Sequence, residues 1–345
     1  MRTLLTSFCL ILLLTTVGNA KIVFKSIDEG FTGMYVMDDD GSNVKLLTKK
    51  SAPRNPNWSP NGKQIVFARF SSDGGRQHFH IAIMNAGGTD IRQLTKPEIG
   101  SDYYPSFSPD GKQVLFTRYE NKINKRSINI LDLESGEIIE IANLNKTSPR
   151  YPTWSPDGRK IVFSTDQFAE DSRNLWIMDA DGKNARQLLP AQEGVTKIVQ
   201  SRPRWSPDGQ QILYSQDEYV DQQVGKVVTE IHKAHRYMIC DQNGENIREL
   251  DIPKDWFPVG LDWMDDGESV LLSMRKIELN KLDFVEVLDY HIYKYHIATK
   301  KLTELTSPLV DGYGVDWVSG RALPVSPKGK KQTQWGEIKK DSSDQ

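Results

Sequence analysis

The feature that most constrains the fold is a short repeat in which an aromatic residue is followed by Ser-Pro-Asp-Gly. Its clearest copy runs from Tyr151 to Phe163 and reads YPTWSPDGRKIVF. The Pro-Asp-Gly part is typical of a tight turn, because proline fixes φ at the first corner and Gly158 tolerates a positive φ. Trp154 before the turn and Ile-Val-Phe after it are typical of two antiparallel strands. Such a hairpin cannot bury its own apolar faces, so it requires neighbours of the same kind.

Copies of this hairpin recur along nearly the whole chain. The first strand carries a large aromatic residue at Trp58, Phe107, Trp154, Trp205, Trp263 and Trp317. The second strand lies near Phe24, Phe67, Phe116, Phe163, Tyr214 and Leu272. The interval between aromatic positions, 47 to 58 residues, accommodates four strands and their loops. A β-sandwich has no reason to repeat this hairpin at a steady interval, whereas a propeller does.

The order of the strands predicts a closed ring. After residue 20 the repeats begin with a second strand, at 21–24, and they end with a first strand, at 314–317. Pairing these two strands completes one blade from both ends of the chain. We therefore predict an all-β fold over residues 21–320, a six-bladed β-propeller of four-stranded antiparallel blades. Closure of the ring removes exposed sheet edges.

Residues 1–20 have the composition of a secretory signal peptide. Residues 4–17 are mostly apolar, and the small residues at 18–20 suit a signal peptidase, so we expect cleavage before Lys21. The apolar run is shorter than the ~20 residues that span a bilayer, which argues against an uncleaved anchor. Cys9 lies inside this run rather than at its end, which argues against a lipoprotein. We therefore expect an exported, periplasmic protein without a later transmembrane segment.

Charge and cysteine content limit which partners and disulfides are expected. The formal net charge is −2, which gives no reason to expect nucleic acid or an acidic membrane surface as a partner. Cys9 leaves with the signal peptide, so Cys240 has no partner for an internal disulfide and is interpreted as a small buried residue. Residues 321–345 leave the repeat pattern and are predicted to form a polar tail. We expect a monomer.

The predicted loops fall into two groups. The turns between first and second strands, and between third and fourth strands, are short and lie on one face of the disc. The loops between second and third strands are longer and dissimilar, at 69–79, 118–126, 165–173, 216–235 and 274–290. They emerge on the other face, together with the connections between blades. Variable loops on a constant scaffold are where binding usually resides, so this face is the predicted binding face.

The repeats resemble those of the TolB-type β-propeller family. The resemblance rests on Pro-x-Trp-Ser-Pro-Asp-Gly followed by Ile-Val-Phe, then on Met-Asp-x-Asp-Gly and Arg-Gln-Leu, and it covers roughly residues 21–318. The repeat is also similar to those of prolyl-oligopeptidase-type peptidases and oligogalacturonate lyases. TolB proteins are periplasmic, work with the Tol system and bind a peptidoglycan-associated lipoprotein through the propeller, so the resemblance implies such a partner. Full TolB proteins also carry an α/β domain before the propeller, which is not expected here.

The sequence offers no catalytic motif. A Gly-x-Ser-x-Gly nucleophile elbow is absent, and the repeated serine is interpreted as a turn hydroxyl that bonds nearby backbone. The segments 38–41 and 179–182 have spacing similar to a calcium loop, but the further oxygen ligands are missing, so we interpret them as Asp-Gly hairpin turns. We therefore predict no catalytic residue, no cofactor and no metal site.

Four of the six histidines lie in or beside the long predicted loops. His78 and His80 flank Phe79, and His232 and His235 stand three residues apart. A metal site needs a further ligand, which the sequence does not show, so a solvated or packing role is favoured. These histidines nevertheless leave open a second function, a metal-assisted polysaccharide lyase of the oligogalacturonate type.

Arginine and aromatic residues stand just before or within the predicted inner strands. In a closed ring they gather around the mouth of the central channel on the variable-loop face. These residue types are enriched at the energetic centres of protein interfaces, and arginine can bind a carboxylate with two hydrogen bonds. The same tyrosines could instead pack between blades. The candidate partner-binding set is Arg54, Tyr103, Tyr104, Arg150, Tyr151, Arg202, Arg204, Trp256, Phe257 and Tyr313. We hypothesise a non-catalytic propeller that binds an envelope protein; the alternatives are the lyase and a carbohydrate-binding scaffold.

Overall fold

The computed structural model describes most of the chain between residues 21 and 318. The described residues are 21–28, 31–49, 52–73, 75–97, 100–142, 147–167, 173–189, 196–224, 227–253, 256–279, 285–306 and 315–318. The predicted signal peptide (1–20), the predicted polar tail (321–345) and Tyr313 lie outside them, so these predictions are not tested by the structure.

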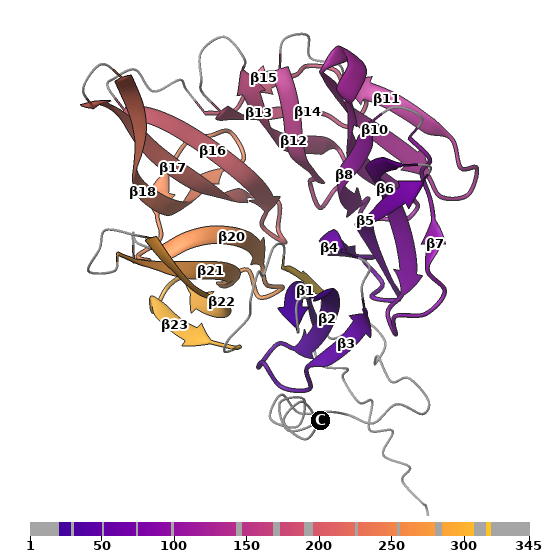
Figure 1. The fold of residues 1–345 in the computed structure, drawn as a ribbon, viewed down its shortest axis with the longest axis horizontal. Helices are drawn as coiled ribbons and strands as arrows, with labels where there is room; N and C mark the ends of the chain where they lie inside the picture. The colour runs from indigo at the N-terminus through magenta and orange to yellow at the C-terminus, as the bar shows by residue number, and fades with distance from the viewer. Residues whose placement is uncertain are drawn as a thin grey trace, which may run out of the picture.

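The strands form six four-stranded antiparallel blades around a common centre, as the repeats predict (Figure 1). One parallel pair, Arg173 opposite Val199, also joins blades 4 and 5 into a continuous sheet. Blade 1 contains β24 (Asp316–Val318), β1 (Lys21–Asp28), β2 (Phe31–Asp38) and β3 (Lys45–Thr48). Blade 2 contains β4 (Arg54–Trp58), β5 (Gln64–Asp73), β6 (Arg76–Asn85) and β7 (Arg92–Gln93). Blade 3 contains β8 (Ser101–Phe107), β9 (Gln113–Glu120), β10 (Lys125–Asp132) and β11 (Ile138–Ala142).

The second half of the chain continues the series. Blade 4 contains β12 (Thr147–Trp154), β13 (Lys160–Gln167), β14 (Arg173–Asp179) and β15 (Arg186–Gln187). Blade 5 contains β16 (Thr196–Trp205), β17 (Gln211–Val224), β18 (Val227–Asp241) and β19 (Arg248–Glu249). Blade 6 contains β20 (Trp256–Trp263), β21 (Ser269–Leu279), β22 (Val285–His296) and β23 (Lys301–Glu304). In each blade the first strand named is the innermost.

Blade 1 closes the ring with strands from both ends of the described chain. Strand β1 pairs antiparallel with β24, and Ile22 lies opposite Trp317. On its other side β1 pairs with β2 over its full length, so it has a partner on both edges. The predicted closure is confirmed, and it removes the edges that two unpaired end strands would expose.

Helix is nearly absent from the described part of the chain. It is confined there to one 3-10 turn at Asn121–Ile123. No helix in the described segments has the length and apolar character that crossing a bilayer requires.

The hydrophobic core is divided into clusters that are each shared by two neighbouring blades. Strand β5 shows how one strand serves two clusters, because side chains alternate between its faces. Ile65 and Phe67 pack in the cluster with blade 1, whereas Val66 and Ala68 pack in the cluster with blade 3. Both faces of a blade are therefore buried. This explains why the second strand of each repeat is a continuous apolar run.

The Ser-Pro-Asp-Gly segment forms the turn between the first two strands. In blade 4, Ser155 Oγ donates to Asp157 Oδ1 (2.6 Å) and accepts from the backbone N–H of Lys160 (2.9 Å). Gly158 takes a φ of 71°, the left-handed conformation that the turn requires. The interpretation of the serine as a turn residue is confirmed.

The Asp-Gly segments form the turns between third and fourth strands. The N–H of Gly41 donates to the Asp38 carbonyl (3.0 Å), and the N–H of Gly182 donates to the Asp179 carbonyl (2.9 Å). The Asp40 carboxylate accepts a bond from the Ser42 N–H (2.9 Å). These carboxylates are thus engaged in hairpin turns, as predicted.

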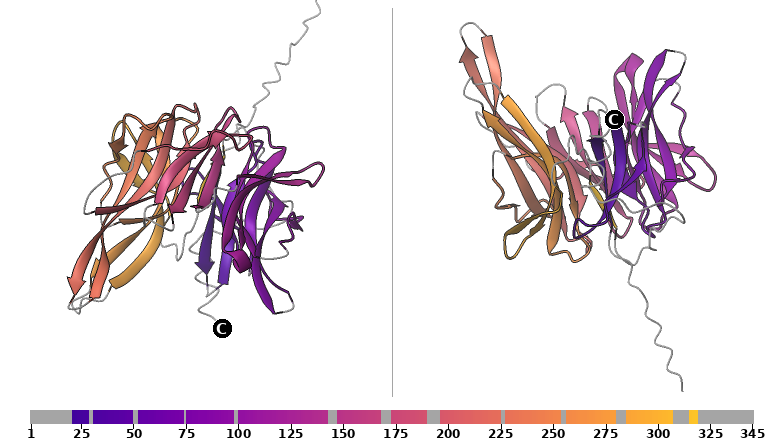
Figure 2. Two further views of the ribbon diagram at one scale, coloured as in Figure 1. Left: turned by 90° about the horizontal axis from the view of Figure 1, so that it is seen from above. Right: turned by 60° about the horizontal axis from the view of Figure 1, so that its bottom comes forward.

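The prediction of long loops between second and third strands is wrong where the structure describes these segments, because most of the described residues in them are strand. Strands β17 and β18 continue to Val224 and Val227, so the predicted loop 216–235 is an extended hairpin. It projects from the disc in both views of Figure 2, where it is drawn in salmon. His232 and His235 lie on β18, and His78 and His80 lie on β6. Charged and amide residues are frequent in these segments, as in QDEYVDQQ at 216–223, so the apolar periodicity that identifies strands is missing although the pairing continues.

Candidate functional site

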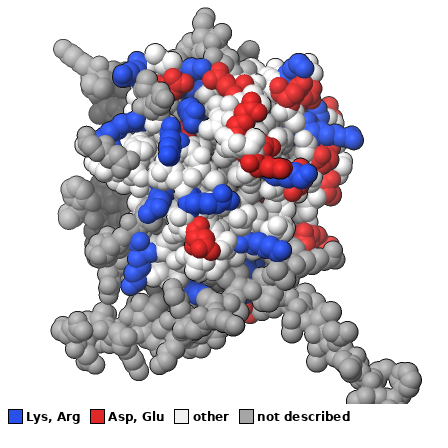
Figure 3. All heavy atoms as spheres, turned by 90° about the vertical axis from the view of Figure 1, so that its right-hand side faces the viewer, with Lys and Arg blue, Asp and Glu red and all other residues white. Residues whose placement is uncertain are grey.

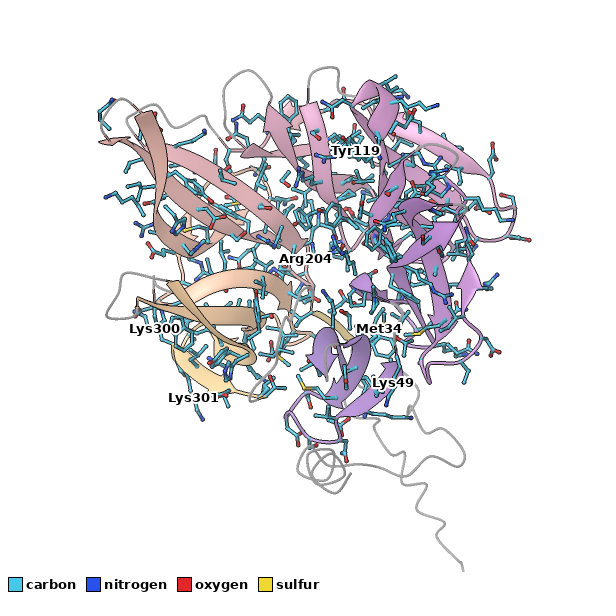
Figure 4. The ribbon with its side chains drawn as sticks, viewed as in Figure 1. Met34, Lys49, Tyr119, Arg204, Lys300 and Lys301 are labelled. Atoms are coloured by element: carbon cyan, nitrogen blue, oxygen red, sulfur yellow. The ribbon has the colours of Figure 1, made fainter. Side chains whose placement is uncertain are left out.

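A cavity of about 400 Å³ lies in the central channel, on the face from which the long hairpins project. We call it the hairpin-face cavity. Its lining comes from all six blades: Lys25, Arg54, Asn55, Tyr104, Tyr151, Arg202, Arg204, Val259, Gly260, Leu261 and Val315. Figure 4 labels Arg204, which lies beside the centre of the ring. Five of the predicted partner-binding residues are therefore brought together around one cavity: Arg54, Tyr104, Tyr151, Arg202 and Arg204.

Four lining residues share an uncommon backbone conformation. Asn55, Tyr104, Tyr151 and Arg202 have φ between 51° and 55°, in the left-handed region. Each precedes a proline, and the pairing register of its inner strand shifts at the same place. Such a β-bulge re-aims side chains, and here it accompanies four side chains that line the channel. The sequence rules do not predict this arrangement, because a residue before proline is ordinarily extended.

A row of aromatic rings crosses three blades beside the cavity. Phe79 of blade 2 lies 5.2 Å from Tyr103 of blade 3, measured between ring centroids. Tyr103 lies 5.9 Å from Tyr104, and Tyr104 lies 4.1 Å from Tyr151 of blade 4. Contacts between rings at these separations stabilise their relative positions. Phe79 was not among the predicted site residues, because it belongs to a hairpin that the sequence did not identify as strand.

Arginines cover both ends of this aromatic row. The guanidinium carbon of Arg54 lies 4.6 Å from the centroid of Phe79, and that of Arg202 lies 5.3 Å from the centroid of Tyr151. Arg202 Nη1 also donates to Ser215 Oγ (3.4 Å). Cation–π contacts of this kind hold a guanidinium in place while leaving part of its hydrogen-bonding edge available.

The hairpin-face cavity is cationic. Lys25, Arg54, Arg202 and Arg204 line it, and none of its described lining residues is acidic. Burial opposes the charge of Arg202, but the neighbouring Tyr151 and Asp217 outweigh this effect and raise its pKa. Lys25 was missed by the sequence analysis, since it belongs to a second strand rather than to an inner one.

The opposite end of the channel has a different charge. A cavity of about 380 Å³ there is lined by the Ser-Pro corners of the repeats and by Asp262 and Asp316, and it shares Arg204, Tyr104 and Tyr151 with the hairpin-face cavity. Asp316 accepts hydrogen bonds from the Trp58 N–H (2.6 Å) and from Asn57 Nδ2 (2.8 Å). Burial, together with the nearby Asp262, raises the pKa of Asp316 well above its usual range. The channel therefore runs from a cationic face to a face with two carboxyl groups.

Of the other predicted site residues, Tyr103, Arg150 and Trp256 are not among the lining residues of the hairpin-face cavity. Tyr103 contributes to the aromatic row, and Arg150 is half-buried on β12. Trp256 packs on Tyr293 (5.1 Å between ring centroids) and on the core between blades 5 and 6. The backbone of Phe257 lies in β20, but its side chain is outside the described part, as is the whole of Tyr313.

Figure 3 shows one outer side of the ring, and the described residues there do not gather charges of a single sign as the hairpin-face cavity does. Basic and acidic side chains both occur there, with uncharged surface between them. This distribution matches the small net charge of the chain, −2.

A second group of polar side chains lies on the long hairpin of blade 5. Asp217, His232 and His235 place one potential ligand atom each within 4.8 Å of the others. The sequence showed two of these residues but not the third, because Asp217 is distant along the chain and is brought in by strand pairing. Strand pairing thus supplies a further potential ligand that the sequence does not show, and the absence of a metal site stays a prediction.

Comparison with known proteins agrees with the fold. The chain matches the family described as TolB beta propeller domain over residues 16–124 and 103–249. A Tol-Pal system protein TolB from Geobacter sulfurreducens is 48% identical over 46 residues, which are 13% of this chain and 11% of that protein. The chain thus spans a small part of the length of the curated relatives it matches.

Two solved structures share the fold at low sequence identity. TolB from Acinetobacter baumannii superposes with a TM-score of 0.65 at 17% identity, over 87% of this chain and 66% of that one. A chain of a nidogen–laminin complex superposes with a TM-score of 0.60 at 11% identity, over 88% of this chain and 99% of that one.

Proposed function

Because the chain belongs to the TolB β-propeller domain family, we propose that it is a non-catalytic propeller that binds a protein of the cell envelope through the hairpin-face cavity. The partner presents a carboxylate-bearing segment to the cavity. A peptidoglycan-associated lipoprotein is the first candidate, since the relatives are Tol-Pal system proteins. Export by the signal peptide at 1–20 and a periplasmic location are part of the same proposal.

The observation that carries the proposal is the pairing of cations with aromatic rings in one concave site. Arg54, Arg202 and Arg204 can each offer two donors to a carboxylate, and Tyr104 and Tyr151 supply rigid contact area. The contacts of Arg202 with Tyr151 and Ser215 orient it before any partner arrives. Such preorganisation reduces the entropy lost on binding. The propeller of the nidogen–laminin complex, which has the same fold, belongs to a protein–protein assembly.

The non-catalytic part of the proposal rests on the chemistry of the lining. The described lining residues of the hairpin-face cavity include no histidine, cysteine, aspartate or glutamate. These are the side chains that most often act as general acid, general base or nucleophile. The lining also holds Lys25, Tyr104 and Tyr151, which can transfer protons, and burial raises the pKa of Tyr104, which disfavours its action as a base at neutral pH. The lyase alternative would instead have to use the histidines of the blade 5 hairpin.

The test is a pull-down from envelope extract with the mature protein and with an Arg54/Arg202/Arg204→Ala triple variant. The proposal expects an envelope protein that the first retains and the second loses, with both proteins giving the same circular dichroism spectrum. Retention by both would place binding elsewhere. Retention by neither, together with depolymerisation of an acidic polysaccharide, would favour the lyase.

A further inference from the structure

Three potential metal ligands face one another on the long hairpin of blade 5. We propose that Asp217, His232 and His235 form a binding site for a divalent transition metal ion of the Zn²⁺ class. Its three residues are not among the described lining residues of the hairpin-face cavity, and the inference does not rest on the proposed partner binding. Two imidazoles and one carboxylate are a donor set that suits zinc and its neighbours in the first transition row.

A β-bulge brings the two histidines to the same face of β18. Residues three apart in a regular strand point to opposite faces, because the side-chain period is two. In the β17–β18 pair, Asp217 lies opposite His235 and Tyr219 lies opposite His232, with a register shift between Glu218 and Tyr219. The extra residue in β18 shifts the alternation of its side chains by one position, so Asp217 and both histidines lie on the same face of the hairpin.

The separations fit a single ion. The candidate ligand atoms lie within 4.8 Å of one another, and the two imidazole rings are stacked with centroids 3.8 Å apart. Ligands at ~2.0–2.1 Å from a tetrahedral ion are about 3.4 Å apart, so binding would require side-chain rotations that bring the candidate ligand atoms to this spacing. Asp217 Oδ1 is hydrogen-bonded to His235 Nδ1, which already holds the carboxylate against one ring.

The surroundings favour ligands that are ready to bind. The His235 side chain is 4% exposed and that of Asp217 is 14% exposed, so water competes little for either. Arg202 opposes cation binding at this site, since its positive charge interacts with the Asp217 carboxylate. On the other face of the hairpin, Glu218 is neutralised by Arg236, whose Nε lies 2.5 Å from its carboxylate.

The donor set also defines what the site should reject. Ca²⁺ and Mg²⁺ prefer six or more oxygen ligands, so two imidazoles discriminate against both. Three protein ligands leave at least one coordination position for water or another donor. The ion would join β17 to β18 across the pair and fix the base of the projecting hairpin.

The experiment uses the mature full chain, stripped with a chelator and titrated with Zn²⁺ against a chromophoric competitor. We expect one equivalent bound with a Kd below about 1 µM, visible absorption bands on replacement by Co²⁺, and no competition from millimolar Mg²⁺. His232→Gln and Asp217→Asn should each weaken binding about 100-fold. His296→Gln is the matched control, because this partly exposed histidine lies on blade 6, and it should leave the affinity unchanged.

Failure of the wild type to bind one equivalent would overturn the proposal. So would equal affinity in the wild type and His232→Gln, or equal affinity in His232→Gln and His296→Gln. The melting temperature of each metal-free variant shows whether it is folded. If His232→Gln does not fold, the stoichiometry and cobalt spectrum of the wild type still decide the question.

Discussion

Closure of the ring can be tested at Gly41, where blade 1 meets blade 6. Gly41 has a φ of 86°, and a Cβ added to it would overlap the carbonyl oxygen of Leu305 and lie 3.1 Å from its carbonyl carbon. Gly136 occupies the corresponding turn of blade 3 with a φ of 75°, and nothing lies within 4 Å of its added Cβ. The two glycines therefore share the backbone conformation but differ in their contact with a neighbouring blade.

The expected destabilisation follows from these two differences. A left-handed conformation costs an alanine about 1–2 kcal/mol, and this cost applies to both Gly41→Ala and Gly136→Ala. Overpacking adds about 1–3 kcal/mol at Gly41 alone, because the obstructing atom belongs to the backbone and cannot rotate away. We expect a loss of about 1–2 kcal/mol for Gly136→Ala and about 2–5 kcal/mol for Gly41→Ala.

The assay is urea unfolding followed by circular dichroism, with thermal melting as a second measurement. For a domain of this size, each 1 kcal/mol corresponds to a shift of about 2–4 °C in Tm. Equal losses for the two variants would show that the turn of blade 1 does not lie against the outer strand of blade 6. The ring would then not close as described.

Two further predictions concern the core and the channel. Phe163→Ala should lower the free energy of unfolding by about 3–5 kcal/mol, because Phe163 is fully buried between blades 3 and 4. Ile123 is exposed, so Ile123→Ala should change the free energy of unfolding by less than about 0.5 kcal/mol. Similar losses for the two variants would contradict the core shared by blades 3 and 4. The pKa of Asp316 is raised in the folded protein, so above about pH 4 the folded state keeps a proton that the unfolded chain has released. The free energy of unfolding of the wild type should therefore fall, relative to that of Asp316→Asn, as the pH rises. The expected slope is about 1.4 kcal/mol per pH unit until the folded-state pKa is passed. Urea unfolding between pH 4.5 and 7.5 without divalent metal measures this difference, and a difference that does not change with pH would contradict it.

The blade count and the ring closure could be predicted from sequence because each hairpin is a local feature. Trp154, the Ser-Pro-Asp-Gly turn and Ile161–Phe163 lie within a few residues of one another, and repetition fixes the number of blades. The end strands at 21–24 and 314–317 then fix the closure.

The details of the site depend on contacts that no local pattern contains. The row from Phe79 to Tyr151 joins three blades, and Phe79, Tyr103 and Tyr151 are far apart in the chain. The left-handed conformation of Tyr104 before a proline contradicts the usual local preference and is imposed by the bulge. Asp217 meets His232 only because a register shift changes which face each side chain occupies.

The central claim, binding of an envelope protein through the hairpin-face cavity, is tested most directly by calorimetry with a single charge reversal. Arg54→Glu reverses one exposed charge at the cavity, and Arg92→Glu makes the same change on the outer strand of the same blade. The titrant is the purified soluble part of the peptidoglycan-associated lipoprotein from the same organism. We predict that the wild type binds and that Arg54→Glu weakens binding about 30-fold, which corresponds to the ~2 kcal/mol of an interface hot spot. Arg92→Glu should change the affinity less than about twofold. Absence of wild-type binding, or equal effects of the two variants, would contradict the account.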